Sequence, residues 1–198
     1  MMLSILVPSI PSRVSRFFTP LYQKLESQVA NNRDVEILAF FDNKRRSVGL
    51  KRDGLVKLAK GEYIVMVDDD DDISDSFVAD ILVAIQSNPG VDLITYNTQA
   101  SLNGANWFTV RYNLDYENQG AYRQGETWMD IQRKPFHNMV WRTSIAQSED
   151  FADASYGEDY HWAQRLHPKV IKSANVDKVL AFYRFNDSVT EAEHTFPT

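Results

Sequence analysis

The sequence predicts an α/β fold, with a mainly parallel sheet that carries helices on both faces. Apolar β-forming runs alternate with helical runs through residues 1–100, and the helical runs are long enough for right-handed βαβ crossovers. A further observation indicates where such a sheet would bind a ligand. Five consecutive aspartates, Asp68 to Asp72, follow directly on the apolar run 62–67, and ligands of open α/β sheets bind at the carboxyl ends of strands.

The first half of the chain alternates between the two kinds of element. Short β-branched and aromatic runs bounded by turn residues predict strands, and apolar residues recurring every three or four positions predict helices. The predicted strands are 3–7, which Pro8 ends, followed by 35–41, 63–67 and 91–96. The predicted helices are 14–29, 48–60 and a third, capped by Ser74, whose apolar positions are Phe77, Val78, Ile81, Leu82 and Ile85.

The second half is less regular. Residues 101–125 are rich in Asn, Gly and aromatic residues, which predicts strands and loops that cover a cleft. After them the pattern predicts a strand over 136–141, a helix over 157–166 and a last strand over 179–185. Because no repeat or linker divides the sequence, we expect a single domain over residues 1–198, composed of the halves 1–100 and 101–198.

Composition excludes several classes of function. Lysine and arginine number 21 against 27 aspartates and glutamates, and this net charge of −6 argues against a nucleic-acid partner. The chain has no cysteine, which excludes disulfides, thiolate metal sites and a cysteine nucleophile. Residues 1–7 lack the features of a signal peptide, and no apolar stretch reaches transmembrane length. We therefore expect a cytoplasmic protein without a transmembrane segment.

The five aspartates need a counter-charge, because adjacent carboxylates repel one another. Their hard oxygen atoms suit Mg²⁺ or Mn²⁺, which also bridge to phosphates. A solvated acidic loop is one alternative, although this run ends a strand. An EF-hand calcium loop is another, but Ile73 stands where that loop needs Gly, and Ala79 where it needs Glu. The run therefore predicts a divalent metal beside a nucleoside diphosphate.

The order of the motifs along the chain resembles one known family. The motifs are Val7-Pro8-Ser9, Asp42 after the second strand, Lys51-Arg52-Asp53, the run 61–71 with its aspartates, and Gly157-Glu158-Asp159 with Arg165-Leu166. Together they closely resemble the family-two glycosyltransferases of the GT-A fold, over nearly the whole chain. The resemblance implies a Rossmann-like sheet and an inverting hexosyltransferase-type enzyme that uses Mn²⁺ or Mg²⁺. It further implies a nucleotide-sugar donor, expected to be a UDP-sugar, bound by residues 1–100, and a glycan or other hydroxyl acceptor bound by residues 101–198.

The resemblance also implies roles for single residues. On the donor side these are Pro8 and Ser9 at the nucleobase, Asp42 on the base, Lys51 and Arg52 near the donor, and Asp68 and Asp69 near the ribose. Asp70 falls on the metal position of the Asp-x-Asp motif, His194 is expected to complete the metal shell from the C-terminal tail, and Asp159 is the catalytic base. The sequence departs from the family after Asp42, where residues 43–46 replace the usual Asp-Gly-Ser and leave base recognition open.

Physical reasoning supports Asp159 separately. A sugar hydroxyl is a weak nucleophile and needs a positioned base. Asp159 shares the spacing i, i+3, i+4 and i+7 with Trp162, Ala163 and Leu166, so it should face inward from the first turn of its helix. An acid at a helix start also stabilises the helix dipole, and that alternative stays open. His137 is open in the same way, between a contact to acceptor or phosphate and a buried structural role.

Two other functions are compatible with the same sheet. One is a protein that binds nucleotide sugar or glycan without turnover. The other is a sugar nucleotidyltransferase, which should carry a Gly-rich phosphate loop after the first strand. This chain has residues 8–12, Pro-Ser-Ile-Pro-Ser, at that place.

Overall fold

The computed structural model describes residues 1–185, apart from the side chain of Asn106. The first half comprises β1 (Leu3–Ser9), a 3₁₀ turn (Pro11–Arg13), a π-helical turn (Val14–Phe18), α1 (Thr19–Val29), β2 (Val35–Phe41), α2 (Val48–Leu58), β3 (Tyr63–Met66), β4 (Asp72–Ile73), α3 (Phe77–Ser87) and most of β5 (Leu93–Leu102). The second half comprises β6 (Ala105–Tyr112), β7 (Arg123–Gln124), β8 (Thr127–Trp128), β9 (Ile131–Arg133), β10 (Val140–Arg142), α4 (Thr143–Ala146), α5 (Glu158–Leu166), a 3₁₀ turn (His167–Lys169) and β11 (Ser173–Phe185).

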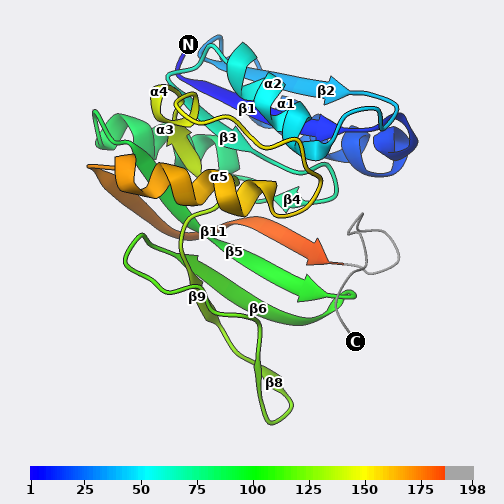
Figure 1. The fold of residues 1–198 in the computed structure, drawn as a ribbon, viewed down its shortest axis with the longest axis vertical. Coiled ribbons are helices and arrows are strands. Elements are labelled where there is room, and N and C mark those ends of the chain that lie inside the picture. Colours follow the sequence, from blue (N-terminus) through cyan, green and yellow to red (C-terminus); the bar gives the residue numbers. More distant parts are fainter. Residues whose placement is uncertain (186–198) are drawn as a thin grey trace.

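The main sheet has the strand order β2-β1-β3-β10-β5-β11-β4, with β6 pairing with β5 and β9 pairing with β6. The pairs β1–β2, β1–β3, β5–β11 and β6–β9 are parallel, whereas the short β10 runs antiparallel to both β3 and β5. Figure 1 shows this curled sheet running through the molecule, with β6 and β9 extending it away from the N-terminal strands. The predicted α/β fold with a mainly parallel sheet is confirmed.

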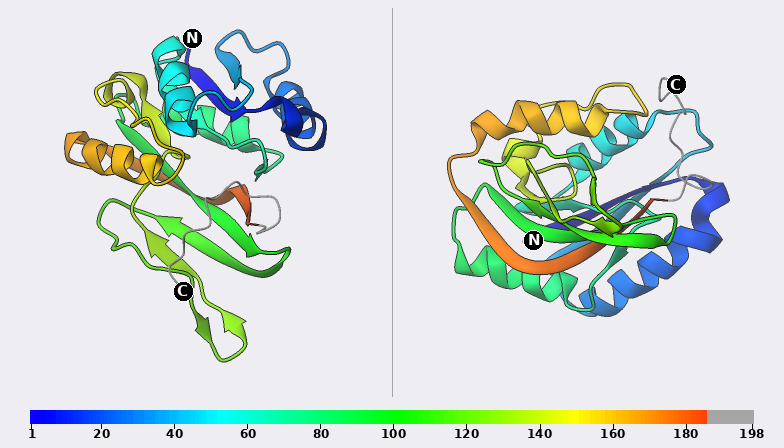
Figure 2. Two further views of the ribbon diagram at one scale, coloured as in Figure 1. Left: turned by 45° about the vertical axis from the view of Figure 1, so that its right-hand side comes forward. Right: turned by 90° about the horizontal axis from the view of Figure 1, so that it is seen from below.

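Helices cover both faces of the sheet, as the sequence predicts. Seen along the sheet, α1 and α3 lie on one face, and α2 and α5 lie on the other (Figure 2). Every residue of β1 and β3 is buried, which is expected for strands that have helices on both sides. Because β1 runs parallel to both β2 and β3, the carboxyl ends of the three strands lie at one edge of the sheet. Residues 9, 42 and 68 lie at this edge.

The first predicted strand continues through Pro8, where the sequence predicted its end. Pro8 and Ser9 pair with β2, whereas pairing with β3 stops at Leu6. A proline cannot donate to a ladder but is tolerated where one side of the strand has no partner. Ser9 is thereby placed at the end of a buried strand and not in a loop.

The predicted helix 14–29 is regular only in its second part. An α-helix proper begins at Thr19, after the 3₁₀ and π-helical turns. Pro20 explains this start, since proline removes a backbone hydrogen bond inside a helix but fits its first turn. Similarly, α3 begins after Ser76 and not at the predicted cap Ser74, whose carbonyl accepts a bond from Phe77 N at 3.2 Å.

The predicted strand 136–141 is a turn in its first part. Met139 N donates to Phe136 O at 3.3 Å, and only residues 140–142 pair with the sheet. In contrast, the last strand is longer than predicted, because β11 begins at Ser173. Within residues 1–185, no helix is long and apolar enough to cross a lipid bilayer.

Candidate active site

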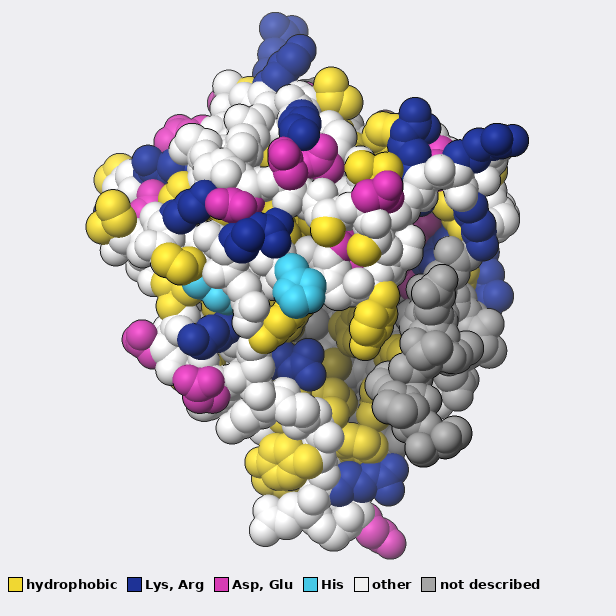
Figure 3. Space-filling model, in the orientation of Figure 1, with side chains coloured by type: hydrophobic (Ala, Val, Ile, Leu, Met, Phe, Trp, Pro, Cys, Tyr) yellow, Lys and Arg dark blue, Asp and Glu magenta, His cyan; other side chains and the backbone are white. Residues whose placement is uncertain are grey.

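A cleft of about 1030 Å³ opens at the carboxyl edge of β1 and β3. Its lining comes from both halves of the chain: the ends of β1 and β3, the start of α2, the turn before β10, and the start of α5. Figure 3 shows hydrophobic side chains gathered in the hollow between α5 and the lower part of the sheet. This volume is at the upper end for small-molecule sites.

The aspartate run is divided among different partners. Asp68, Asp69, Asp70 and Asp71 line the cleft. Asp72 instead lies in β4 and pairs with Lys24 at 3.1 Å and Arg184 at 2.9 Å. The run is therefore neither a solvated loop nor a uniform cluster, since its first four members face the cleft and the fifth fixes a sheet edge.

The four carboxylates of the cleft differ in how strongly nearby cations stabilise their charge. Although burial opposes ionisation, Arg52 and His137 hold the pKa of Asp68 well below its usual range. Burial raises the pKa of Asp69 to about 6, against Ser9 and Arg13, which lower it. Burial and the charge of Asp68 also raise the pKa of Asp70, and the same two causes raise that of Asp71 further. Negative charge is therefore in excess at this end of the cleft.

Arg52 connects the two halves at the centre of the site. It lies in α2, its side chain is 6% exposed, and its Nη2 donates to both oxygens of Asp68 at 2.7 and 2.9 Å. Its Nη1 donates to Glu158 at the start of α5. The predicted donor residue Arg52 thus also positions the Glu-Asp pair.

Asp159 lies in the same cleft, next to His137. Its Oδ2 is 3.1 Å from His137 Nδ1, and its Oδ1 accepts from Tyr160 N at 2.7 Å. The other ring nitrogen of His137, Nε2, is 3.1 Å from Arg52 Nη2 and 3.4 Å from Asp68 Oδ2. Against the effect of burial, His137 and Arg52 lower the pKa of Asp159, so its carboxylate is ionised at neutral pH. The structure therefore places His137 between Asp159 and Asp68.

The remaining predicted donor residues lie at the ends of β1 and β2. Pro8 and Ser9 line the cleft, and Ser9 Oγ donates to Asp69 Oδ2 at 2.5 Å. Lys51 also lines it, with Nζ 3.4 Å from both Ser9 O and Asp42 Oδ1. Asp42 itself is not among the described residues that line the cleft, and its Oδ2 accepts from Arg46 N at 2.7 Å. Asp42 thus stabilises its own loop and Lys51.

Sequence reasoning missed Arg13, which enters the cleft from the turn after β1. Its Nη2 is 2.9 Å from Asp69 Oδ1 and 2.6 Å from Asp70 Oδ2. The signal that could have found it is the aspartate run itself, because buried carboxylates require a nearby cation and Arg13 is the first arginine after the strand. The predicted metal ligand His194 lies outside the described residues.

The carboxylates of the cleft can be compared with the ligands that a divalent cation needs. Within residues 1–185, no group of three or more His, Cys, Asp or Glu side chains is arranged to hold a metal ion. Mg²⁺ and its analogues, however, bind through one or two carboxylates together with substrate phosphates. Asp69 and Asp70 offer hard oxygen atoms on a cleft wall with excess negative charge. These two residues therefore fit such a cation.

The opposite wall of the cleft is largely apolar. Alternate residues of β5 and β6 line it, which follows from the two-residue period of a strand. These residues are Thr98, Ala100 and Leu102 of β5, and Phe108, Val110 and Tyr112 of β6. The cleft thus combines a charged end with a wall suited to the non-polar faces of a larger ligand.

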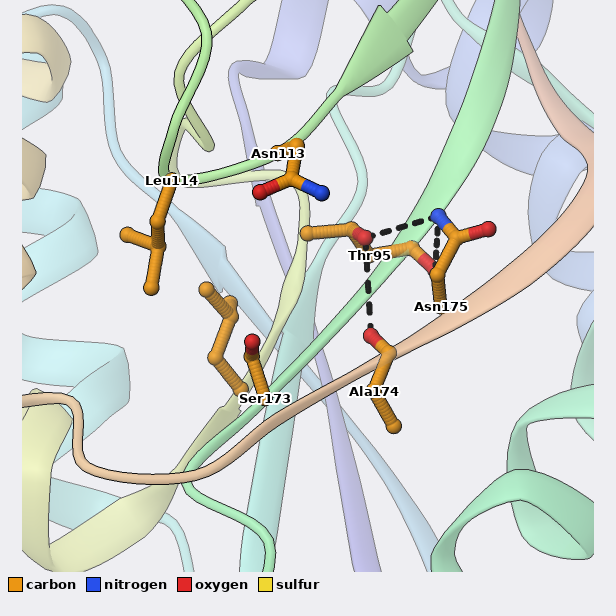
Figure 4. Close-up of a pocket in the computed structure, with 7 residues that line it drawn as sticks. Thr95, Asn113, Leu114, Ser173, Ala174 and Asn175 are labelled. Atoms are coloured by element: carbon orange, nitrogen blue, oxygen red, sulfur yellow. Dashed lines mark hydrogen bonds between the residues drawn. The ribbon is translucent and has the colours of Figure 1, made fainter.

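A second, smaller hollow of about 130 Å³ lies at the opposite ends of β5 and β11. Figure 4 shows its lining, in which Asn175 Nδ2 donates to Thr95 Oγ1 at 2.9 Å and Asn113 and Ser173 lie nearby. None of the residues that line it is titratable. The described lining of this hollow therefore offers no titratable group for acid or base chemistry, and the candidate active site is the larger cleft.

Comparison with solved structures identifies the fold. No family model and no curated protein sequence matches the chain. Residues 1–349 of S. aureus TarS, in complex with UDP-GlcNAc, match with a TM-score of 0.70 at 14% identity, covering 97% of this chain and 62% of that one. The mannosyltransferase PcManGT from Pyrobaculum calidifontis, in complex with GDP-Man and Mn²⁺, matches with a TM-score of 0.57 at 9% identity, covering 91% and 56%.

A structure of similar length also matches. A197 from STIV has a TM-score of 0.51 at 13% identity, and the match covers 94% of this chain and 87% of that one. The chain thus spans roughly three fifths of the TarS fragment but most of A197. These matches show that the chain has a GT-A-type glycosyltransferase fold, as the sequence predicts.

Proposed function

We propose that this chain is a metal-dependent inverting glycosyltransferase that transfers a sugar from a UDP-sugar to a hydroxyl acceptor. The observation that carries the proposal is one arrangement: Asp68, Asp69 and Asp70 from one half and Asp159 from the other face a single cleft. Arg52 and His137 connect the two groups of carboxylates. Transfer needs both ends, because the leaving diphosphate and the attacking hydroxyl react at one carbon atom.

The donor is assigned to the first half, residues 1–100, within a single domain over residues 1–198. Pro8, Ser9, Lys51 and Arg52 line the cleft beside the aspartates, at the strand ends where ligands of such sheets bind. UDP-GlcNAc, UDP and GDP-Man occupy the solved structures of similar fold, which supports a nucleotide-sugar donor. Asp42 is assigned an indirect part, since it holds Lys51.

A cation is assigned to Asp70, with Asp69 beside it. When bound, Mn²⁺ or Mg²⁺ would offset the charge that develops on the leaving diphosphate. The Mn²⁺ in the similar mannosyltransferase structure supports this choice. His194 is retained as a third ligand from the C-terminal tail, and the cytoplasmic location that the sequence predicts likewise stays a prediction.

The acceptor is assigned to the second half, with Asp159 as base. An ionised carboxylate can accept a hydrogen bond from the acceptor hydroxyl and take its proton as the new bond forms. His137 and the backbone N–H of Tyr160 hold the two oxygens of Asp159 in place. The apolar wall of β5 and β6 is available for the non-polar faces of the acceptor.

Titration calorimetry with UDP, with and without Mn²⁺, tests the donor site. Asp70→Asn should lose the metal-dependent part of UDP binding, because a charged oxygen ligand is removed. Asp72→Asn is the matched control, since Asp72 belongs to the same run but pairs with Lys24 and Arg184 outside the cleft. Equal metal-dependent affinities in the wild-type protein and Asp70→Asn would refute the metal assignment.

A second measurement distinguishes an enzyme from a binding protein. Wild-type protein with Mn²⁺ and a panel of UDP-sugars should release UDP, and NMR of the product should show inversion at the anomeric carbon. A protein that binds UDP-sugars tightly but releases no UDP, with or without hydroxyl acceptors, would be a binder without turnover.

A further inference from the structure

Arg13 lies between the two carboxylates that the proposed function assigns to the cation. Its Nη2 is 2.9 Å from Asp69 Oδ1 and 2.6 Å from Asp70 Oδ2. A guanidinium most often meets one carboxylate with two parallel N–H groups. Here one nitrogen meets two carboxylates, as a compact cation would. A divalent ion that took oxygen ligands from both aspartates would therefore need the position of this nitrogen.

The segment that carries Arg13 is suited to movement. Residues 11–18 form a 3₁₀ turn and a π-helical turn, and neither contains a buried residue. Short turns of these kinds often occur at functional sites. Phe18 packs against Phe41 and anchors the end of the segment, whereas the turn 11–13 that carries Arg13 has no buried residue, and segments of low burial open at low free energy. The aspartates, in contrast, follow directly on β3 (Tyr63–Met66), in which every residue is buried. Arg13 can therefore shift without disturbing Asp69 and Asp70.

A second contact of Arg13 supports such a shift. Its Cζ lies 5.0 Å from the centroid of the Phe17 ring, within the range of a cation–π interaction. Phe17 belongs to the same short segment. A shift of the guanidinium away from the carboxylates can keep this contact, because both residues belong to the same short segment.

We propose that Arg13 is an internal counter-ion that exchanges with the divalent cation. Without ligands, Arg13 neutralises Asp69 and Asp70. If a divalent ion took the two carboxylates, repulsion between the two cations would displace the guanidinium, which could then bind the diphosphate of the donor. Guanidinium groups bind phosphate oxygens well, so the displaced group finds a partner within the cleft. This inference rests on the proposed function and adds to it the order of charge exchange.

The test uses Arg13→Gln and two calorimetric titrations, one with Mn²⁺ alone and one with UDP at saturating Mn²⁺. Removal of the competitor should tighten Mn²⁺ binding by roughly fivefold, or about 1 kcal/mol, the upper scale of a partly exposed ion pair. UDP should bind roughly tenfold more weakly, the scale of one charged hydrogen bond. Opposite changes for the two ligands are the expected signature.

Two variants serve as controls. Arg13→Lys keeps a positive charge beside the aspartates and should retain Mn²⁺ affinity near that of the wild-type protein. Arg16→Gln changes a neighbouring arginine that contacts Phe17 with its Cζ at 4.9 Å, and should change neither titration. Melting temperatures confirm that each variant is folded.

The outcomes that overturn the inference are distinct. If Arg13→Gln weakens both ligands, Arg13 only supports the geometry of the carboxylates. If UDP binding needs no Mn²⁺ in the wild-type protein and is lost in Arg13→Gln, Arg13 is a permanent counter-ion and no exchange occurs. Unchanged affinities for both ligands also overturn it. If the wild-type protein binds neither Mn²⁺ nor UDP, the proposed function fails together with the inference.

Discussion

Asp159 shows how one carboxylate is prepared for its proposed role. Burial alone would raise its pKa, but His137 and Arg52 lower it instead. The group is therefore always ionised near neutral pH, at the expense of basic strength. A base of this kind contributes mainly through position and through concerted proton transfer in the transition state. His137, whose ring is close to both Asp159 and Asp68, fixes that position.

Asp159→Asn should separate chemistry from donor binding. The amide keeps the shape but cannot take the proton, so turnover should fall by roughly 10²-fold or more, the scale of general-base catalysis. The Kd for UDP should stay within a small factor, since Asp159 contacts His137 and not the aspartates at the other end of the cleft. Turnover and UDP affinity are measured on one preparation.

Asp150→Asn is the control for that experiment, because Asp150 is a 76% exposed carboxylate shortly before the same helix. It should leave turnover unchanged. Near-normal turnover in Asp159→Asn would refute the base assignment. A parallel loss of UDP affinity would instead assign Asp159 to the support of Arg52 and Asp68.

At the residue scale, the sequence pointed to several of the charged residues that line the cleft but not to how their charges pair. Asp68, Asp69, Asp70 and Asp159 could be found because each belongs to a local motif at an element end. The pairing of Arg13 with Asp70 and the contact between His137 and Asp159 could not, because they join positions far apart in the chain. Only the need of buried carboxylates for cations pointed to such partners, without naming them.

At the scale of elements, α2 is the part that brings the two halves together. Gly49 N donates to Ala154 O at 2.9 Å, and a Cβ atom at Gly49 would lie 2.0 Å from Ala152 O. This close approach holds the loop before α5 against the start of α2. It therefore positions Glu158 to receive Arg52.

Gly49→Ala should destabilise the protein by about 1–3 kcal/mol, the usual range for overpacking, and should weaken UDP binding through displacement of α5. Gly54→Ala is a matched control in the same helix, since its Cβ would lie 3.4 Å from the Phe40 ring. Alanine has the higher helix propensity, by about 1 kcal/mol, so this variant should be as stable as the wild-type protein or more so. Urea unfolding measures the unfolding free energy of both variants and of the wild-type protein. A Gly49→Ala variant as stable as the wild-type protein would contradict the close contact at Gly49.

The 3₁₀ turn that follows α5 predicts a pH dependence of stability. His167 Nε2 donates to Pro135 O at 2.8 Å, and its ring stacks on Trp141. Burial lowers the pKa of His167 from 6.5. As pH falls below 6.5, the unfolded chain takes up a proton that the folded protein does not, so this group makes the unfolding free energy decrease toward acid pH.

His167→Gln should remove that contribution, giving a shallower fall of the unfolding free energy below pH 6.5. His161→Gln, an exposed position in α5, should keep the wild-type slope. Urea unfolding over a pH series at constant ionic strength measures all three proteins. An unchanged slope in His167→Gln would show that another group sets the acid limit.

The elements themselves were predictable where local pattern alone determines them. β2 has its predicted bounds, and β1, β3, α2 and α3 are close to theirs, because local apolar runs bounded by turn residues mark them. The strand predicted over 136–141 was wrong in its first part, since only residues 140–142 pair, and their place in the sheet depends on β3 and β5. The added length of β11 likewise follows from pairing with the whole of β5, which no local pattern encodes.

At the scale of the molecule, the two halves of the sequence share one sheet. β10 of the second half lies between β3 and β5 of the first, through the pairs Trp141 with Ile64 and Val140 with Ile94. β11 then pairs with β5 along its length. The two halves of the sequence are therefore not separate structural units, because their strands alternate in space.

This interleaving predicts that residues 1–100 do not fold alone. The fragment would contain β3 and β5 but not β10, the strand that lies between them and pairs with both. Ile64 and Ile94 are each 0% exposed in the protein, and both would lose their partner strand in the fragment. A fragment of this kind should show no cooperative transition in urea, by circular dichroism, whereas the full chain should show one. Addition of residues 101–198 should restore a transition, because the missing strands return. A cooperative transition in the isolated fragment would show instead that β1, β2 and β3 form an independent unit, to which the catalytic half is added.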